Sequence, residues 1–90
     1  MELGSQVCIA PTWWLASLGL ERENMFETGL TECRVSLRVP RAKIEGAVFL
    51  DLSPVDFSRE PTPAMFYFSD DAEMPYLNIP AARGLGLWLW

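Results

Sequence analysis

The sequence contains no histidine, and its two cysteines, Cys8 and Cys33, lack the C-x-x-C spacing of metal and redox sites. Histidine is the side chain that most readily exchanges protons or binds metals near neutral pH, so its usual chemistry is excluded. No lysine or arginine precedes residue 22, and the apolar run from Trp13 to Leu20 is short, so the pattern does not indicate a secretory signal. We therefore expect a cytoplasmic protein with two buried, unreactive thiols.

Basic residues are also few: seven Lys and Arg stand against twelve Asp and Glu, which gives a net charge of −5. A negative surface repels phosphate backbones, so direct binding of nucleic acid is not expected. No apolar stretch approaches the roughly 20 residues that span a bilayer, and no membrane partner is expected either. The charge favours a basic protein partner, although the same charge also serves to keep a small protein soluble.

Apolar and aromatic residues are plentiful: half of the chain is hydrophobic, with four Trp, five Phe and two Tyr. Residues 1–90 make a single domain, and a chain of this size buries roughly 60–65% of its unfolded surface. The composition therefore predicts a real core. It also predicts an apolar surplus at the surface, available to a partner or to a second copy of the chain.

The hydrophobic pattern predicts several short strands and one helix, which begins at Trp13 with Thr12 as its N-cap and ends at Gly19. Strands are expected at residues 6–10, 32–39, 47–52, 64–68, 76–79 and 85–90, with a proline-rich loop at 53–63 and a turn at 80–84. The fold class is therefore α+β, with a small antiparallel β-sheet of about five strands covered by one short helix.

Two of these strands have specific expectations. In residues 32–39 the apolar side chains at 33, 35, 37 and 39 alternate with polar ones, which predicts a half-exposed strand. Residues 47–52 are almost continuously apolar, which is typical of a central strand buried on both faces.

Basic and acidic residues are segregated along the chain. Four of the seven basic residues are Arg34, Arg38, Arg41 and Lys43. On a strand, Arg34 and Arg38 share one face that either binds an anion or an acidic partner, or is neutralised by the flanking Glu32 and Glu45.

The segment 45–73 carries seven acidic residues and one arginine. Asp70, Asp71 and Glu73 fall on a predicted turn. Their spacing differs from that of calcium loops, and no glycine provides the sharp bend. We expect no metal there, and interpret the segment either as a plain acidic turn or as a contact surface for a basic partner. No other motif indicates a cofactor or a catalytic residue.

The predicted partner-binding residues combine carboxylates with aromatic anchors. They are Asp56, Glu60, Asp70, Asp71 and Glu73 together with Trp13, Tyr76, Trp88 and Trp90. Tryptophan is the residue type most enriched at binding hot spots. The final segment LGLWLW is expected to be a central strand, a homodimer seam or a patch that binds a partner.

One segment resembles a known family. Residues 43–52, KIEGAVFLDL, resemble the H-I-P-G-A-x-F-F-D-I-D segment of rhodanese-type sulfurtransferases, and residues 14–16, WLA, resemble the W-L-A near the start of their N-terminal domain. Lys43 stands where the family has His, Glu45 stands where it has Pro, and no cysteine follows position 33. The resemblance therefore implies an inactive or truncated relative.

A second resemblance is one of type. Small, acidic, single-domain chains are similar to phage-encoded inhibitors of host defence, anti-CRISPR proteins among them, which present carboxylates and aromatic rings to the nucleic-acid-binding surface of a target. We therefore predict a non-enzymatic protein-binding or inhibitory module that acts on a larger basic protein or nucleoprotein complex. The alternatives are a rhodanese-like relative and a structural homo-oligomer.

Overall fold

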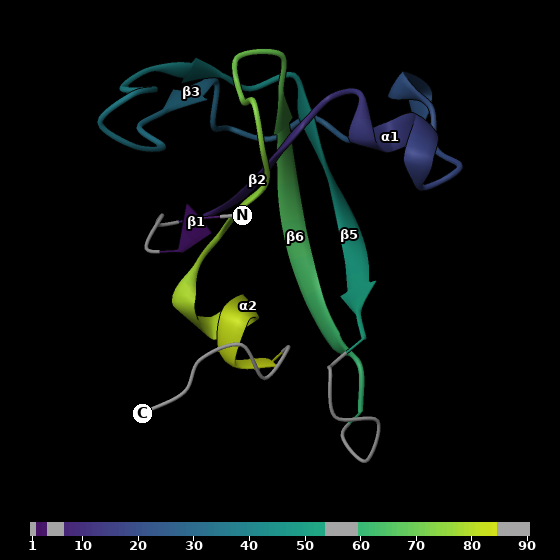
Figure 1. The fold of residues 1–90 in the computed structure, drawn as a ribbon. Coiled ribbons are helices and arrows are strands. Elements are labelled where there is room, and N and C mark those ends of the chain that lie inside the picture. Colours follow the sequence, from purple (N-terminus) through teal and green to yellow (C-terminus); the bar gives the residue numbers. More distant parts are fainter. Residues whose placement is uncertain (1, 4–6, 54–59, 85–90) are drawn as a thin grey trace.

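The computed structural model describes residues 2–3, 7–53 and 60–84 (Figure 1). The helices are α1 (Trp14–Ser17), α2 (Ile79–Gly84) and a short 3-10 helix, η1 (Arg22–Asn24). The strands are β1 (Glu2–Leu3), β2 (Cys8–Pro11), β3 (Glu32–Cys33), β4 (Ala42–Lys43), β5 (Gly46–Leu52), β6 (Thr62–Ser69) and β7 (Tyr76–Leu77). The α+β class is confirmed, with more strands and more helices than expected.

The main sheet has the strand order β1-β7-β2-β6-β5, and a second, two-stranded sheet pairs β3 with β4. β5 and β6 form an antiparallel hairpin, whereas β2 joins β6 in parallel, with Cys8 opposite Phe66. The prediction of an antiparallel sheet is therefore wrong, because the main sheet is mixed. A parallel pair needs a crossover connection, and here the crossover contains α1, η1, the whole second sheet and β5.

One face of the main sheet carries a large hydrophobic cluster. Phe66 and Phe68 of β6 are at most 1% exposed, and they pack with Leu15 of α1 and Ala81 of α2. Trp14 stacks on Phe66 with 6.4 Å between the ring centroids. Because burial of one such side chain contributes roughly 1.5–3 kcal/mol, these rings fix both helices against the sheet.

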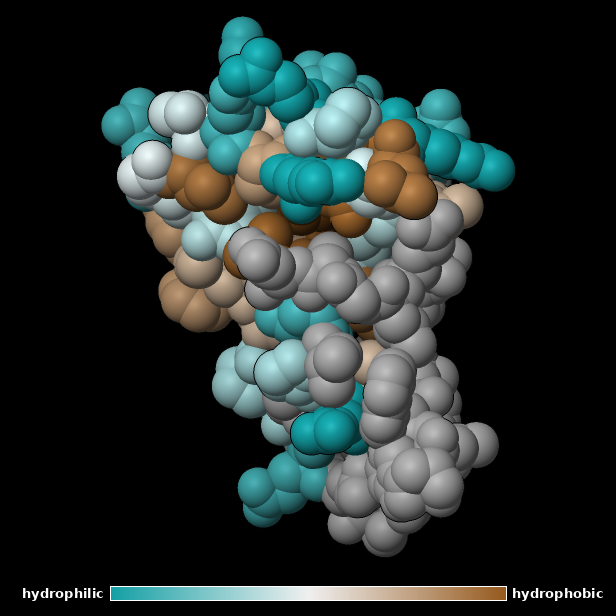
Figure 2. All heavy atoms as spheres, turned by 90° about the vertical axis from the view of Figure 1, so that its left-hand side faces the viewer, coloured by the Kyte–Doolittle hydropathy of each residue, from teal (hydrophilic) through white to brown (hydrophobic). Residues whose placement is uncertain are grey.

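The opposite face is partly covered by the second sheet and its connections. Ile9 of β2 and Tyr76 of β7 pack there against Val35, Ala42 and Ile44. β2 is therefore buried on both faces, since successive side chains of a strand point to opposite sides. Seen from the left-hand side of Figure 1, the upper half of the molecule shows hydrophobic residues among hydrophilic ones (Figure 2).

The predicted strand at 47–52 exists, but its position is different from the one predicted. β5 is an edge strand, and exposure alternates from Val48 onward: Val48, Leu50 and Leu52 are half-buried, whereas Phe49 is 66% exposed and Asp51 is exposed as well. The prediction of burial on both faces is wrong. A continuous apolar run shows which residues favour burial, but not which neighbours are available to bury them.

The predicted strand at 32–39 is reduced to Glu32–Cys33. The chain then turns, because the Ser36 hydroxyl oxygen accepts hydrogen bonds from the backbone N–H groups of Arg38 and Val39 at 3.2 and 3.1 Å. Such local bonds offer the backbone an alternative to strand pairing. Leu37 is 88% exposed instead of facing the core. Arg34 and Arg38 consequently do not share a strand face.

The helices also differ from expectation at their ends. Trp13, not Thr12, is the N-cap of α1, and it makes no side-chain capping bond. Gly19 follows the helix with a positive φ of 73°, as predicted for a terminator. The predicted turn at 80–84 belongs to α2, where the Asn78 side-chain oxygen accepts the N–H of Ala81 at 3.0 Å. Within the described residues no helix has the length and apolar character needed to cross a membrane.

Other predicted elements follow the sequence closely. β6 contains the predicted strand at 64–68 and extends it at both ends, and β2 and β7 lie within or beside the predicted strands at 6–10 and 76–79. The predicted strand at 85–90 and the centre of the predicted loop at 53–63 lie outside the described residues.

A substitution at Gly46, the first residue of β5, tests how closely this edge is packed. A Cβ at this position would lie 2.8 Å from the Met25 Cβ, whereas a Cβ at Gly29 meets nothing within 4 Å. We expect Gly46→Ala to lower the free energy of unfolding by about 1–3 kcal/mol through overpacking. Gly29→Ala, the matched control, should stay within about 0.5 kcal/mol of the parent. Urea titrations of both variants measure this, and equal stabilities would contradict the packing at Gly46.

Candidate functional site

The outer edge of β5 has one paired position within the described residues. Phe26 donates its N–H to the Ala47 carbonyl at 3.0 Å and accepts the Ala47 N–H at 3.1 Å. The backbone groups of Ala47 therefore point away from β6, and by the two-residue period those of Phe49 and Asp51 do the same. Pro63, which has no N–H to donate, lies opposite Asp51 in the register, as this alternation requires.

Two phenylalanine rings lie exposed at this edge. Phe26 and Phe49 stack with 5.6 Å between ring centroids and an interplanar angle of 24°. Phe26 is 40% exposed and Phe49 is 66% exposed. Half-buried Met65, opposite Phe49 in the register, continues the apolar surface onto β6. Exposed apolar groups gathered in one place are typical of a binding surface.

Exposed carboxylates lie in the same two segments as the rings. A hollow of about 300 Å³ lies between residues 27–31 and 44–46, and Glu27 and Glu45 both line it. The two segments that form the edge, 23–29 and 44–52, contain four acidic residues and no lysine or arginine. We call Phe26, Glu27, Glu45, Phe49 and Asp51 the edge surface. It combines exposed aromatic rings with negative charge.

The sequence interpretation missed the edge surface as a binding site. One signal pointed to it: Asp51 interrupts the apolar run 47–52 two residues after Phe49, so both side chains fall on one face of the strand. A carboxylate on that face indicates solvent and not a buried central strand. No sequence pattern indicates that Phe26 belongs to this surface, because the bridge between Phe26 and Ala47 joins segments far apart in the sequence.

Trp13 is exposed, as predicted for an anchor. Its side chain is 62% accessible, and its ring meets that of Trp14 edge-on at 6.4 Å. Because Trp14 is itself held against Phe66, Trp13 is presented from a fixed position. Leu18, 43% exposed, adds a second large apolar side chain just after α1.

The other predicted aromatic anchors are not available in this way. Tyr76 is 4% exposed, because it pairs with both Ile9 and Glu2 in the main sheet and packs in the core. Its prediction as a surface anchor is wrong. Trp88 and Trp90 lie outside the described residues.

The predicted carboxylates do not form one group. Glu60 precedes β6 and Asp70 follows it, so the eight residues of the strand separate them by roughly 23 Å at about 3.3 Å per residue. Figure 1 shows the corresponding ends of β6 at opposite ends of the molecule. Both are exposed, as are Asp71 and Glu73. Asp56 lies outside the described residues.

Two of these carboxylates hold the fold together. Asp70 accepts the hydroxyl of Thr12, and its Oδ1 lies 3.4 Å from Nη2 of Arg22. Asp71 accepts the backbone N–H of Lys43 at 2.8 Å. The turn after β6 is thereby connected both to the start of α1 and to β4. The sequence interpretation of this turn, as a plain acidic turn or as a contact surface, did not include these contacts within the fold.

The basic segment is partly neutralised within itself. The Arg41 guanidinium lies 3.2 Å from a Glu32 carboxylate oxygen across the β3–β4 pair. Both side chains are more than half exposed, so the ion pair contributes little to stability. Among the described residues, no cluster of cysteine and carboxylate side chains is suited to hold a metal ion.

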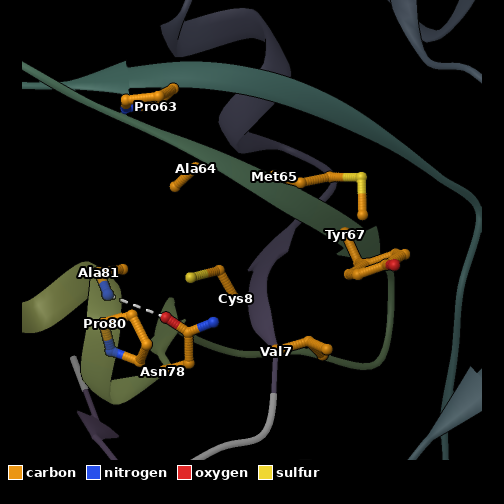
Figure 3. Close-up of a pocket in the computed structure, with 9 residues that line it drawn as sticks. All are labelled: Val7, Cys8, Pro63, Ala64, Met65, Tyr67, Asn78, Pro80 and Ala81. Atoms are coloured by element: carbon orange, nitrogen blue, oxygen red, sulfur yellow. Dashed lines mark hydrogen bonds between the residues drawn. The ribbon is translucent and has the colours of Figure 1, made fainter.

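A second hollow, of about 290 Å³, lies between β6, the start of β2 and α2 (Figure 3). The Cys8 side chain points into this space, and the Asn78–Ala81 hydrogen bond closes one side of it. Burial raises the pKa of the Cys8 thiol, which a hydrogen bond with the Asn78 backbone only partly offsets. Burial also raises the pKa of Cys33. Neither thiol is therefore activated as a nucleophile.

Thiol reactivity tests this conclusion. The Cys8 thiol is 1% exposed, and its pKa is raised above the ordinary value of 9.0. We therefore expect Cys8 to react with iodoacetamide at pH 8 at least ten times more slowly in the folded protein than in guanidinium chloride. Its rate should keep rising with pH above the ordinary thiol value, since the thiolate forms only there. Cys33, half-buried, should react faster than Cys8. Peptide mass spectrometry measures both rates, and a native Cys8 as fast as the unfolded one contradicts the assignment.

The structural role of the acidic turn is tested separately. Asp71→Ala removes the acceptor of the Lys43 N–H, and we expect a loss of about 1 kcal/mol in the free energy of unfolding. Glu73→Ala removes the same charge from an exposed residue of the same turn and should change stability by less than about 0.5 kcal/mol. Thermal or urea unfolding compares the two. Equal losses would indicate a general charge effect instead of the hydrogen bond.

Comparison with models of protein families, with curated proteins and with solved structures finds no match to this chain. The edge surface is therefore interpreted from its own residues.

Proposed function

We propose that this protein is a non-enzymatic binding module that docks on, and thereby inhibits, a larger protein with a basic surface. The observation that supports this is the edge surface, where the stacked rings of Phe26 and Phe49 lie exposed beside carboxylates. Aromatic residues in partner pockets supply much of the energy of protein interfaces. Burial of each exposed ring contributes up to about 1.5–3 kcal/mol.

The carboxylates of the edge surface favour a partner whose surface is positively charged. Glu27, Glu45 and Asp51 attract a basic surface and increase the rate of encounter, whereas the aromatic rings slow dissociation. The protein's net charge of −5 acts in the same direction at longer range. Because these carboxylates are exposed, salt screens their attraction, and binding weakens as ionic strength rises.

An acidic module of this kind competes with nucleic acid for its target. A groove that binds phosphate backbones is lined with lysine and arginine, and the edge surface offers carboxylates in place of phosphates. Nucleoprotein complexes are therefore part of the proposed partner class, as in anti-CRISPR inhibitors. The size and acidity of the chain support this class.

Trp13 and Leu18, at the two ends of α1, are further exposed apolar side chains. In the proposed complex Trp13 is a further anchor. Asp70 and Asp71 contribute mainly to the fold, and Glu60 and Glu73 contribute to the negative field. The contact residues thus differ from the predicted set, while the combination of acidic and aromatic residues remains.

A pull-down with matched variants tests the proposal. The tagged protein should retain a partner with a basic surface from native lysate at low salt and release most of it at high salt. Phe49→Ser should retain at least tenfold less, which corresponds to about 1.4 kcal/mol. Leu37→Ser, an 88% exposed leucine on the β3–β4 connection, is the control and should bind as the parent does.

Quantitative mass spectrometry reads the retained protein. Equal retention by Phe49→Ser and Leu37→Ser contradicts the role of the edge surface, and the absence of any salt-sensitive partner contradicts the proposed function. Glu27→Lys combined with Glu45→Lys should reduce binding at low salt and remove most of its salt dependence.

A further inference from the structure

The outer edge of β5 indicates how a partner binds to the protein. This inference rests on the proposed function. We propose that an extended, basic segment of the partner adds to the main sheet as a new strand beside β5. Strand addition to a sheet edge is a recurring mode of peptide recognition, in which backbone hydrogen bonds provide affinity and alternate side chains provide specificity.

The backbone of β5 leaves groups available for such a strand. Phe26 occupies the outward N–H and C=O of Ala47, the second residue of β5. The outward groups of Phe49 and Asp51 follow along the same edge, and no strand of the described residues pairs with them. The stretch from Val48 to Leu52, which no strand of the described residues pairs on its outer side, is about 13 Å long at roughly 3.3 Å per residue. It therefore accepts a segment of about five residues.

The negative charge of the edge surface favours a basic segment over a second copy of this chain. Natural edge strands commonly carry charges that prevent pairing with another copy, and here the edge carries Asp51 toward the end of β5, with Glu27 and Glu45 beside the Phe26–Ala47 bridge at its start. Two copies paired edge to edge would bring these carboxylates together, between chains that each have a net charge of −5. A basic segment meets the opposite situation, because each carboxylate gains a partner of opposite sign.

The side chains of β5 define the sequence of that segment. On one face, Phe49 and Asp51 favour lysine or arginine, which contact the ring through a cation–π interaction and pair with the carboxylate. On the other face, the half-buried Val48, Leu50 and Leu52 favour apolar residues. The segment therefore alternates basic and apolar residues. In antiparallel addition, the more stable arrangement, its basic residues exchange hydrogen bonds with Phe49 and Asp51.

The probe is an eight-residue peptide of alternating lysine and valine with blocked ends, titrated into the ¹⁵N-labelled full chain. Its binding should slow hydrogen exchange of the Phe49 and Asp51 amides at least tenfold. The amide of Leu50, which faces β6, serves as the internal control and should change little. Unchanged exchange at Phe49 and Asp51 with saturating peptide overturns the proposal.

Two methylated peptides test the backbone bonds directly. N-methylation of the lysines should weaken binding at least tenfold, whereas N-methylation of the valines, whose N–H groups point away from β5, should change it less than threefold. The reverse order supports strand addition in the parallel direction. Equal effects of the two peptides overturn the proposal, because side-chain contacts alone do not distinguish them.

Two further outcomes separate this inference from the proposed function. If Phe49→Ser weakens partner retention but the peptide protects neither Phe49 nor Asp51, the binding function stands and strand addition fails. If protection of these amides rises with protein concentration in the absence of peptide, the edge belongs to a second copy of this chain, which overturns the basic occupant.

Discussion

The pairing of β6 with a strand on each side is the constraint on which the remaining structure depends. Phe66 and Phe68 fill one face of the sheet, and Ser69, fully buried, ends the strand by accepting the Asp71 N–H. β2 enters beside β6 in parallel, so the chain between β2 and β5 has to cross to the other side of the hairpin. That crossover supplies α1, η1 and both strands of the small second sheet. α1 and the β3–β4 pair thus lie against the main sheet because the chain crosses it between β2 and β5, whereas α2 follows β7.

The same arrangement places β5 at the edge. With β6 already paired to β2, β5 has one long neighbour, and in the part of the chain that the structure describes its outer side pairs only with Phe26, through a short bridge. Phe26 both satisfies the backbone of Ala47 and places its ring against Phe49. The exposed aromatic pair is therefore a direct product of how the crossover returns to the sheet. Among the described residues this edge combines apolar rings, backbone groups that no strand pairs and carboxylates, and the proposal of a basic, extended partner rests on that combination.

Acidic residues serve two different purposes in this fold. Asp70 and Asp71 connect the turn after β6 to the start of α1 and to β4, and Asp70 also pairs with Arg22. The carboxylates of the edge surface have no lysine or arginine in their own segments, so their field is directed outward. The two thiols have no comparable role. Burial raises the pKa of both, and the segment that resembles sulfurtransferases lies in β4 and β5 without an activated cysteine among the described residues.

The sequence by itself determined the α+β class, the strands β2, β6 and β7, the terminator Gly19 and the burial of Cys8. Each of these depends on local preferences, namely apolar runs and the freedom of glycine to adopt positive φ. Only the tertiary structure decided that residues 47–52 form an edge, that Tyr76 is buried, that Leu37 is exposed and that Glu60 lies far from Asp70. The reason is physical: hydrophobic pattern records which side chains favour burial, whereas strand order and direction decide which faces are covered. A surface made by Phe26 and Phe49 exists only after residues distant in the chain have been paired.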